Sequence, residues 1–258
     1  MREVASRIGL VKLQNCPITK LQMPLDILAL AAHRDDVEQT CAGTLLKMAE
    51  CGYRTGILDL TQGEMGTRGT AEDRAREAAD AARILKVSWR QALDIFDGRV
   101  ENTWENRVKV VRVLREQRPR VLILPYWEGR HPDHYTASVL GYEAAFLSGL
   151  AKLPLKGSAH RPFKIIYASL YRDVRPTFVV DITDQFETRF RALMAYKSQF
   201  TDQEAGTGIF PAQKEIRARI ESMARYYGML GGVTYAEPFV QKEVGLVDDV
   251  MAIPVKSI

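Results

Sequence analysis

The chain has 258 residues, a hydrophobic content of 46% and a formal net charge of +4. This length allows one large α/β domain or two small ones, and the apolar content is sufficient for a globular core. We expect no membrane-spanning helix, because no apolar run reaches roughly 18 residues. The N-terminal 16 residues also lack the long apolar segment of a secretory signal. The mild charge, without a basic tract interleaved with aromatic residues, argues against nucleic-acid binding.

The three cysteines, Cys16, Cys41 and Cys51, are odd in number and form no CxxC pair. They predict neither a disulfide framework nor a cysteine-based zinc site, and they favour a reducing, cytoplasmic location. Cys41 falls within a helical pattern and is expected to be a small buried side chain.

The first part of the chain predicts an N-terminal arm over residues 1–22, followed by one domain over residues 23–258. Residues 25–32 (LDILALAA) are almost continuously apolar, which is typical of a strand buried on both faces. Apolar side chains at helical spacing follow over 37–50, and Gly52 ends this helix. A second strand is predicted at 55–60, a turn-rich segment at 61–70, and a helix at 72–85, which is rich in Ala, Arg and Glu.

The remainder continues to alternate strands with helices. Strands are predicted at 92–96, 121–125, 164–170 and 177–182, and helices at 104–117, 135–150, 186–197 and 216–227. Residues 199–211, which are polar and contain glycine, are a candidate flexible loop over a site. This alternation predicts a single α/β domain with a Rossmann-like, mainly parallel sheet flanked by helices.

Three of the four histidines lie in two short motifs. His33 belongs to AAHRDDVE, and His131 and His134 belong to GRHPDH. Each motif directly follows a predicted buried strand, and the carboxyl ends of parallel strands line the ligand crevice of an open sheet. Strands that neighbour one another can therefore bring His33 and His134 together across about a hundred residues.

These residue types can form a catalytic zinc site. His33, Asp36 and His134 supply a His₂Asp set, and three protein ligands with one open position are typical of catalytic zinc. The metal would lower the pKa of its water and polarise a carbonyl oxygen. Asp35, which points away from its neighbour Asp36 in a turn, could accept a proton from the attacking water.

The second motif also offers an acid. His131 lies three residues before His134, near the metal without having to bind it. Asp133 could hold the His131 ring as imidazolium, so that His131 stabilises an oxyanion and protonates the leaving nitrogen.

Each feature also has a structural interpretation. A single histidine at a strand end is more often structural or exposed, an Asp-Asp pair often caps a helix, and HPDH can simply begin one. Two such motifs, both following apolar strands, favour the metal site. A dinucleotide-binding fold is disfavoured, because AAHRDD replaces the GxGxxG fingerprint after the first strand.

The two motifs resemble those of a known family. AAHRDDVE is similar to the AHPDDxE signature, and GRHPDH to the HPDH signature, of the LmbE-like or PIG-L N-acetylglucosamine deacetylases. The segments LDLTQGEMGTRGT, RALMAYKSQF and YAEPF are similar to later parts of the family, so that the resemblance covers most of the chain after residue 24. Within the family, the resemblance points to the bacillithiol-pathway deacetylases, which act on N-acetylglucosaminyl-malate.

The resemblance implies the same roles for the motif residues: zinc ligands at His33, Asp36 and His134, the general base at Asp35, and the oxyanion-stabilising acid at His131 with Asp133. It also implies substrate contacts. Arg74 matches a family arginine that faces the site, Tyr196 matches a tyrosine that helps bind the oxyanion, and Glu64 could contact sugar hydroxyls. Their structural alternatives are a surface helix arginine, an aromatic residue packed between helix and sheet, and a turn cap.

One position departs from the family pattern, since Arg34 replaces the usual proline of AHPDD. Proline would fix φ in the turn that aims the ligands, whereas arginine leaves the turn more flexible. Arg34 could pair with a substrate carboxylate or point to solvent.

The sequence thus predicts a zinc-dependent deacetylase of a small amino-sugar conjugate, with Fe²⁺ as an alternative ion. It also predicts a homo-oligomer, to which the N-terminal arm could contribute. Two alternatives stay open: a metal hydrolase of another amide or ester, and a catalytically silent sugar-binding protein.

Overall fold

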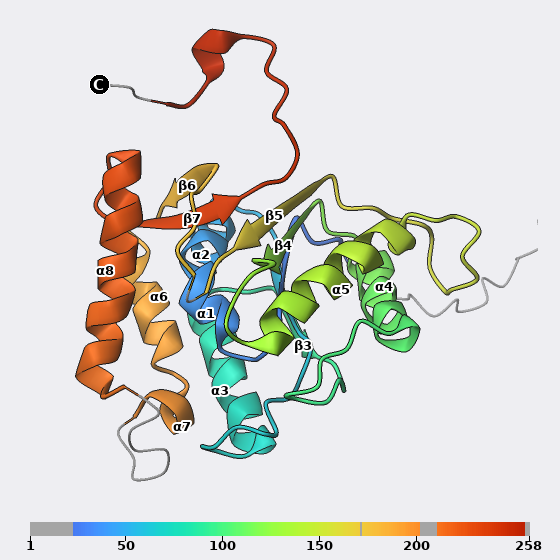
Figure 1. The fold of residues 1–258 in the computed structure, drawn as a ribbon, viewed down its shortest axis with the longest axis horizontal. Coiled ribbons are helices and arrows are strands. Elements are labelled where there is room, and N and C mark those ends of the chain that lie inside the picture. The colour runs from blue at the N-terminus through green and yellow to red at the C-terminus, as the bar shows by residue number, and fades with distance from the viewer. Residues whose placement is uncertain (1–22, 171, 202–210, 256–258) are drawn as a thin grey trace, which may run out of the picture.

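A computed structural model describes residues 23–170, 172–201 and 211–255. Seven strands form one sheet in the order β3-β2-β1-β4-β5-β7-β6 (Figure 1). The strands are β1 (Ile27–Ala31), β2 (Thr55–Asp59), β3 (Trp89–Ala92), β4 (Val121–Pro125), β5 (Lys164–Ala168), β6 (Phe178–Asp181) and β7 (Ala236–Val240). The first five are mutually parallel, whereas β7 runs antiparallel to both β5 and β6. The expected single-domain α/β fold with a mainly parallel sheet is therefore confirmed.

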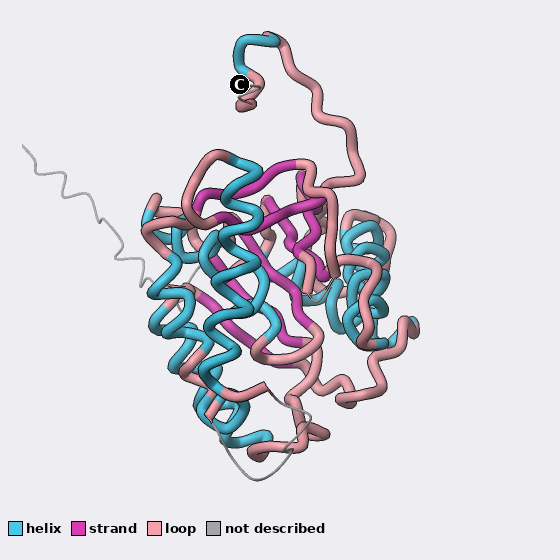
Figure 2. Tube along the Cα trace, turned by 60° about the vertical axis from the view of Figure 1, so that its left-hand side comes forward, coloured by secondary structure: helices cyan, strands magenta, loops and turns pink. Residues whose placement is uncertain are grey.

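Helices cover both faces of the sheet (Figure 2). They are α1 (Asp36–Thr40), α2 (Ala42–Glu50), α3 (Ala71–Ile84), α4 (Trp104–Gln117), α5 (Pro132–Ser148), α6 (Phe186–Leu193), α7 (Lys197–Phe200) and α8 (Gln213–Gly231). Along β1, Leu28 and Leu30 pack towards α4 and α5. Ile27 and Ala29 pack towards the core formed by α1, α2, α3 and α6. This burial on both sides explains the nearly continuous apolar run of the first strand.

Several predicted elements differ from the structure in position. The helix expected over 37–50 is two helices, because Cys41 leaves helical geometry with φ of −137°. The third strand begins earlier than expected, at Trp89. Strand β7 was not predicted as a strand. The expected arm over residues 1–22 and most of the loop expected over 199–211 lie outside the described residues.

The direction in which successive strands are added to the sheet reverses between β1 and β4. From β1 the chain builds β2 and β3 on one side of the sheet, and then returns to place β4 on the other side of β1. Ligands of open α/β sheets bind at such a switch point. Within the described residues, no helix has the length and apolar character needed to cross a membrane.

A buried carboxylate joins strand β7 to helices α2 and α6. Glu237 on β7 accepts hydrogen bonds from the backbone N–H groups of Gly43 and Thr44, at 2.8 and 2.7 Å, in the first turn of α2. It also pairs with Arg189 of α6 at 3.1 Å, and both side chains are buried. Glu237 therefore supplies negative charge to a helix N-terminus and to a buried guanidinium at once.

We predict that Glu237→Ala destabilises the protein by about 3–5 kcal/mol, because it leaves Arg189 buried without its carboxylate. Urea unfolding followed by circular dichroism measures the change. Glu215→Ala, which removes an exposed carboxylate of α8, is the matched control and should stay within about 0.5 kcal/mol of the parent. Equal stabilities for the two variants would contradict the assigned role of Glu237.

Candidate metal centre

The switch point brings the two histidine motifs together. His33 follows β1 in the turn that leads to Asp35 and to Asp36, the first residue of α1. The second motif follows β4, where His131 is the N-cap of α5 and His134 lies in its first turn. Strands β1 and β4 are hydrogen-bonded neighbours. The expected approach of His33 and His134 follows directly from that pairing.

Three side chains converge on one point with the spacing of metal ligands. His33 Nδ1 lies 3.1 Å from His134 Nε2. Asp36 places one carboxylate oxygen 3.4 Å from His33 Nδ1 and the other 3.2 Å from His134 Nε2. Ligand atoms about 2.0–2.2 Å from a tetrahedral zinc ion lie roughly 3.3–3.6 Å apart. The donor set and its spacing therefore fit a divalent ion that accepts nitrogen and oxygen ligands.

The other ring nitrogen of His33 faces two further carboxylates. His33 Nε2 lies 3.0 Å from Asp97 Oδ1 and 3.3 Å from Asp133 Oδ2. Asp133 is itself fixed by the backbone N–H groups of Gly98 and Val100, at 2.8 and 3.2 Å. A carboxylate behind a ligating imidazole fixes its tautomer and raises its basicity. His33 thus has a metal-facing nitrogen and a carboxylate-facing nitrogen.

The electrostatics at this point favour positive charge. Burial lowers the pKa of His33, but the charge of Asp36 and hydrogen bonds with Asp133, Asp36 and Asp97 outweigh it and raise the pKa to about 12. Burial likewise opposes the ionised form of Asp36, yet His134 and His33 hold its pKa well below the ordinary value. Buried carboxylates that stay ionised need a cation between them, which agrees with the donor geometry.

Asp35 lies beside this cluster and is oriented by Arg74. Arg74 of α3 donates from Nη2 to Asp35 Oδ1 at 2.8 Å, and both side chains are largely buried. Gly63, at φ of +73°, allows this approach, because a Cβ there would lie 2.8 Å from the Arg74 guanidinium. Arg74 therefore faces the site, as expected, and the carboxylate that it binds there is the candidate base.

His131 differs from the expected pairing. Its Nδ1 accepts a hydrogen bond from the Asp133 backbone N–H at 3.2 Å, whereas the Asp133 carboxylate contacts His33. The pKa of His131 is lowered by burial and by neighbouring His33 and His134. Because Nδ1 is an acceptor, the proton of the neutral ring lies on Nε2. The structure thus presents His131 as a neutral Nε2–H donor and does not support an imidazolium held by Asp133.

Two expected substrate contacts also differ. Tyr196 is fully buried, and its hydroxyl donates to the Arg34 carbonyl and lies 3.2 Å from Glu38 Oε1. Arg34 points neither to solvent nor into the crevice, because it is buried and donates to the Ala71 carbonyl at 2.6 Å. Both side chains support the turn that carries the ligands.

Glu64 caps a turn, which was the structural alternative to a contact with sugar hydroxyls. It is exposed and accepts hydrogen bonds from the backbone N–H groups of Gln62 and Asp97, at 3.2 and 2.8 Å. Asp97 itself was missed in the sequence. Its signal is a carboxylate in the loop that follows the third strand, five residues after the strand ends and at the same edge of the sheet as both histidine motifs.

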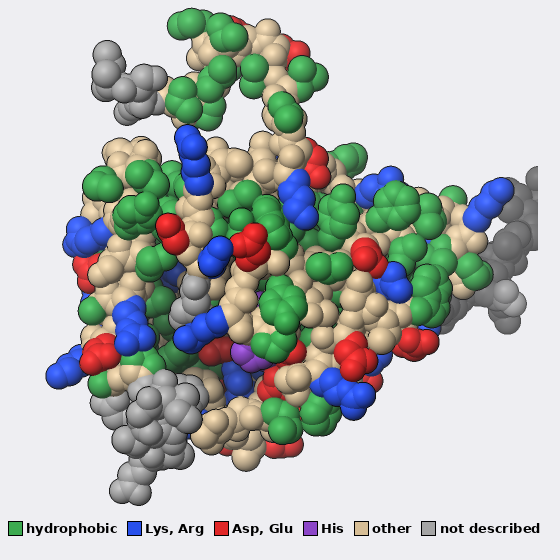
Figure 3. Space-filling view, in the orientation of Figure 1, with side chains coloured by type: hydrophobic (Ala, Val, Ile, Leu, Met, Phe, Trp, Pro, Cys, Tyr) green, Lys and Arg blue, Asp and Glu red, His purple; other side chains and the backbone are tan. Residues whose placement is uncertain are grey.

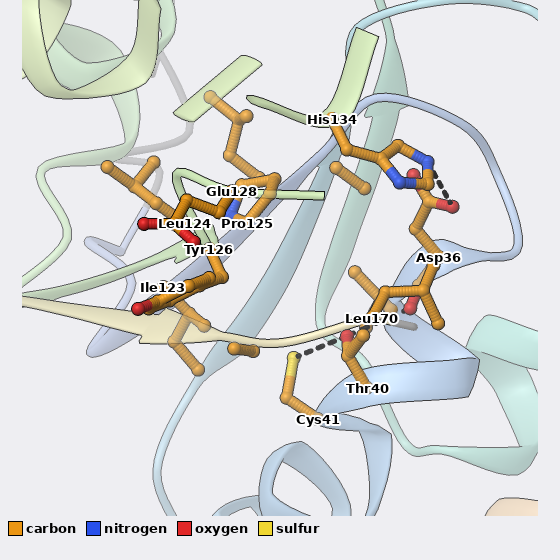
Figure 4. Close-up of a pocket in the computed structure, with 14 residues that line it drawn as sticks. Asp36, Thr40, Cys41, Ile123, Leu124, Pro125, Tyr126, Glu128, His134 and Leu170 are labelled. Atoms are coloured by element: carbon orange, nitrogen blue, oxygen red, sulfur yellow. Dashed lines mark hydrogen bonds and ion pairs between the residues drawn. The ribbon is translucent and has the colours of Figure 1, made fainter. Parts of the chain in front are cut away.

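A small cavity opens beside Asp36 and His134 (Figure 4). Leu124 and Pro125 lie across from Asp36 and His134, the lining is mainly apolar and includes Leu170, and Cys41 lies at its floor. Its volume is about 20 Å³, compared with the roughly 10–15 Å³ that a single water needs. A group the size of a methyl can therefore sit next to the ligand cluster.

A buried His₂Asp cluster with an adjacent carboxylate, at the switch point of an α/β sheet, defines the active-site class of metal-dependent hydrolases. Residues 28–145 match the family described as PIG-L: GlcNAc-PI de-N-acetylase. A diacetylchitobiose deacetylase of Thermococcus kodakarensis is 31% identical over 224 residues, covering 82% of this chain and 80% of that protein. The chain belongs to the PIG-L family, and it is accordingly a metal-dependent N-deacetylase.

Solved structures agree with this assignment. A conserved protein of Thermus thermophilus is 40% identical with a TM-score of 0.79, covering 87% of this chain and 98% of that one. An N,N′-diacetylchitobiose deacetylase of Pyrococcus horikoshii is 26% identical with a TM-score of 0.73, covering 83% of this chain and 82% of that one.

We predict that the cluster controls metal content. After metal stripping and zinc addition, His33→Ala should lose the bound zinc and its stabilisation, whereas Asp35→Asn should keep the metal, because Asp35 lies outside the ligand triangle. Elemental analysis and thermal melts measure both. His160→Ala is the matched control, since His160 lies outside this cluster and contacts the Pro119 carbonyl. Full zinc retention in His33→Ala would contradict the ligand assignment.

Proposed function

We propose that this enzyme removes the acetyl group from an N-acetylglucosamine unit, with N-acetylglucosaminyl-malate as the preferred substrate and bacillithiol synthesis as the pathway. The observation that carries the proposal is the convergence of His33, Asp36 and His134, with Asp35 held alongside by Arg74. When bound, zinc would supply Lewis acidity towards the acetamide carbonyl and make water more acidic. Fe²⁺ suits the same donors.

The chain's own residues account for the proton transfers. Asp35 accepts the proton of the attacking water through the carboxylate that Arg74 orients. His131, with its proton on Nε2, donates a hydrogen bond to the oxyanion. The Asp133 backbone N–H fixes that tautomer. Asp35, which then carries the proton taken from water, protonates the leaving nitrogen and returns to the ionised form. Hydrolysis of the amide then releases acetate and the free amine.

The entrance to the site supports an anionic conjugate. Glu128 lines both the small cavity and a wider surface hollow of about 480 Å³ with Arg130 and Arg172 on its wall. Arg172 pairs with Glu128 at 3.0 Å, but both side chains are about half exposed, so the pair is weak and can be exchanged for a ligand carboxylate. In Figure 3, basic side chains lie around a hollow in which a histidine is visible. A sugar with an attached malate matches this placement of charge.

Acetate release tests the proposal. Zinc-loaded protein should hydrolyse N-acetylglucosaminyl-malate faster than N,N′-diacetylchitobiose or free N-acetylglucosamine. Faster hydrolysis of the disaccharide would support the deacetylase activity but contradict the malate conjugate as the preferred substrate. Release from other amides or esters alone would favour a different metal hydrolase. Binding of these sugars without any release would identify a silent sugar-binding protein.

We predict that Asp35→Asn lowers kcat roughly 10²–10⁴-fold, because the base is lost, while zinc content stays unchanged. Acetate release at saturating substrate measures kcat. Asp94→Asn, which alters an exposed carboxylate paired with Lys109, is the control and should keep full turnover. Full turnover in Asp35→Asn with zinc bound would show that Asp35 is not the base.

We predict that the small cavity selects acetyl over longer acyl groups. One additional methylene should lower kcat/KM roughly 10–200-fold, as is usual for a tight apolar pocket. Cys41→Ala enlarges the floor and should raise the relative rate on the N-propionyl analogue several-fold. Cys51→Ala, at an exposed cysteine, should leave the propionyl-to-acetyl ratio unchanged. An unchanged ratio in both variants would place the acyl group elsewhere.

A further inference from the structure

The C-terminal segment leaves the body of the protein as an apolar arm. After β7, residues 244–255, here called the C-terminal arm, stand clear of the sheet and helices in both views (Figures 1 and 2). Val244, Leu246 and Met251 are 97%, 93% and 86% exposed. The arm has local structure, because Asp249 caps the short 3₁₀ helix Val250–Ala252. A run of exposed apolar side chains on an ordered segment indicates a binding surface.

The outer face of α5 carries a second apolar surface. Tyr135, Val139, Tyr142 and Phe146 are separated by four, three and four residues, a spacing that aligns them along one side of a helix. Their exposed fractions are 42%, 43%, 42% and 56%. Aromatic side chains in such a stripe are enriched at protein–protein interfaces. We call these four residues the α5 stripe.

A groove connects the α5 stripe with the beginning of the arm. It has a volume of about 400 Å³ and is lined by Tyr142 and Phe146, by residues 161–166, and by Glu243–Gly245 at the start of the arm. Strand β7 pairs with β5 only at Tyr167 and Ala168. The side of Lys164–Ile166 that faces away from β4 therefore has no strand partner within the described residues, and it can accept an extended segment.

The charges of arm and groove are complementary. Asp248 and Asp249 are exposed on the arm, whereas Arg161 and Lys164 line the groove. The arm begins at the rim of the groove of its own chain and runs outward (Figure 1). Each chain therefore offers an extended apolar segment with acidic residues and a matching apolar groove with basic residues.

We propose that the C-terminal arm of one copy docks in the α5–β5 groove of a second copy of this chain. Reciprocal docking forms a closed pair, because each copy supplies one arm and one groove. The contact covers apolar residues of the arm and the α5 stripe together and places Asp248–Asp249 near Arg161 and Lys164. The site of self-association is thereby assigned to the C-terminal end of the chain.

Cross-linking between differently tagged chains tests the proposal. In a background with Cys16→Ser and Cys51→Ser, one chain carries Leu246→Cys and the other Phe146→Cys. After mixing and mild oxidation, a disulfide should join the two tags. In the matched control, the second chain carries Met229→Cys, at an exposed position of α8, in place of Phe146→Cys. This pair should give no such product. No product with Phe146→Cys, or equal products at both positions, would overturn the proposal.

Light scattering of the full chain provides the second measurement. The parent should be a dimer or a larger assembly. Leu246→Asp combined with Met251→Asp should weaken self-association at least roughly 100-fold, without change in the thermal midpoint of the body. Met229→Asp should leave the mass unchanged. A monomeric parent, or an unchanged mass in the arm variant, would overturn the proposal.

Discussion

The structure depends on the crowding of buried carboxylates around one imidazole. Asp36, Asp97 and Asp133 all lie within 3.4 Å of a His33 ring nitrogen, an arrangement that is stable only where positive charge is shared among them. The same carboxylates also hold the surrounding loops, because Asp97 accepts the Met65 backbone N–H at 3.1 Å and Asp133 accepts those of Gly98 and Val100. The carboxylates that surround His33 thus also hold the loops that follow β2 and β3 beside the site. Metal affinity and local order in these loops are coupled for this reason.

The sequence predicted an element of the fold correctly where residues close together in the chain determine that element. Helix α4 was predicted with its observed bounds, since a Thr103 cap and apolar spacing define it within a few residues. The two histidine motifs were predictable as a pair because strand ends of a parallel sheet converge. Strand β7 was missed since it contains Pro238, a residue that argues against an inner strand. Pro238 is accommodated because it pairs only with Val179 of β6, beyond the end of the β5 pairing.

The site was predicted less completely than the fold. Residue type and position identified which side chains gather there, but their orientation depends on tertiary contacts. Asp133 was placed against His131 from sequence proximity, whereas its carboxylate faces His33, a hundred residues away. Asp97 has no motif of its own and becomes visible only when β3 is placed beside β2. Tyr196 was expected to help bind the oxyanion, whereas in the structure its hydroxyl donates to the backbone carbonyl of Arg34.

The departure at Arg34 is resolved by that same contact. Proline would set the ligand turn by restricting φ, and its loss leaves the turn to be held by other means. Here the Arg34 carbonyl accepts hydrogen bonds from Tyr196 and Arg90, while its guanidinium ties the turn to the Ala71 carbonyl at the start of α3. Arg90 is in turn fixed by buried Asp59 and Glu38. Tertiary hydrogen bonds thus replace a local backbone restraint, so the ligand turn stays in place only as long as α3, β3 and Tyr196 at the start of α7 remain packed against it.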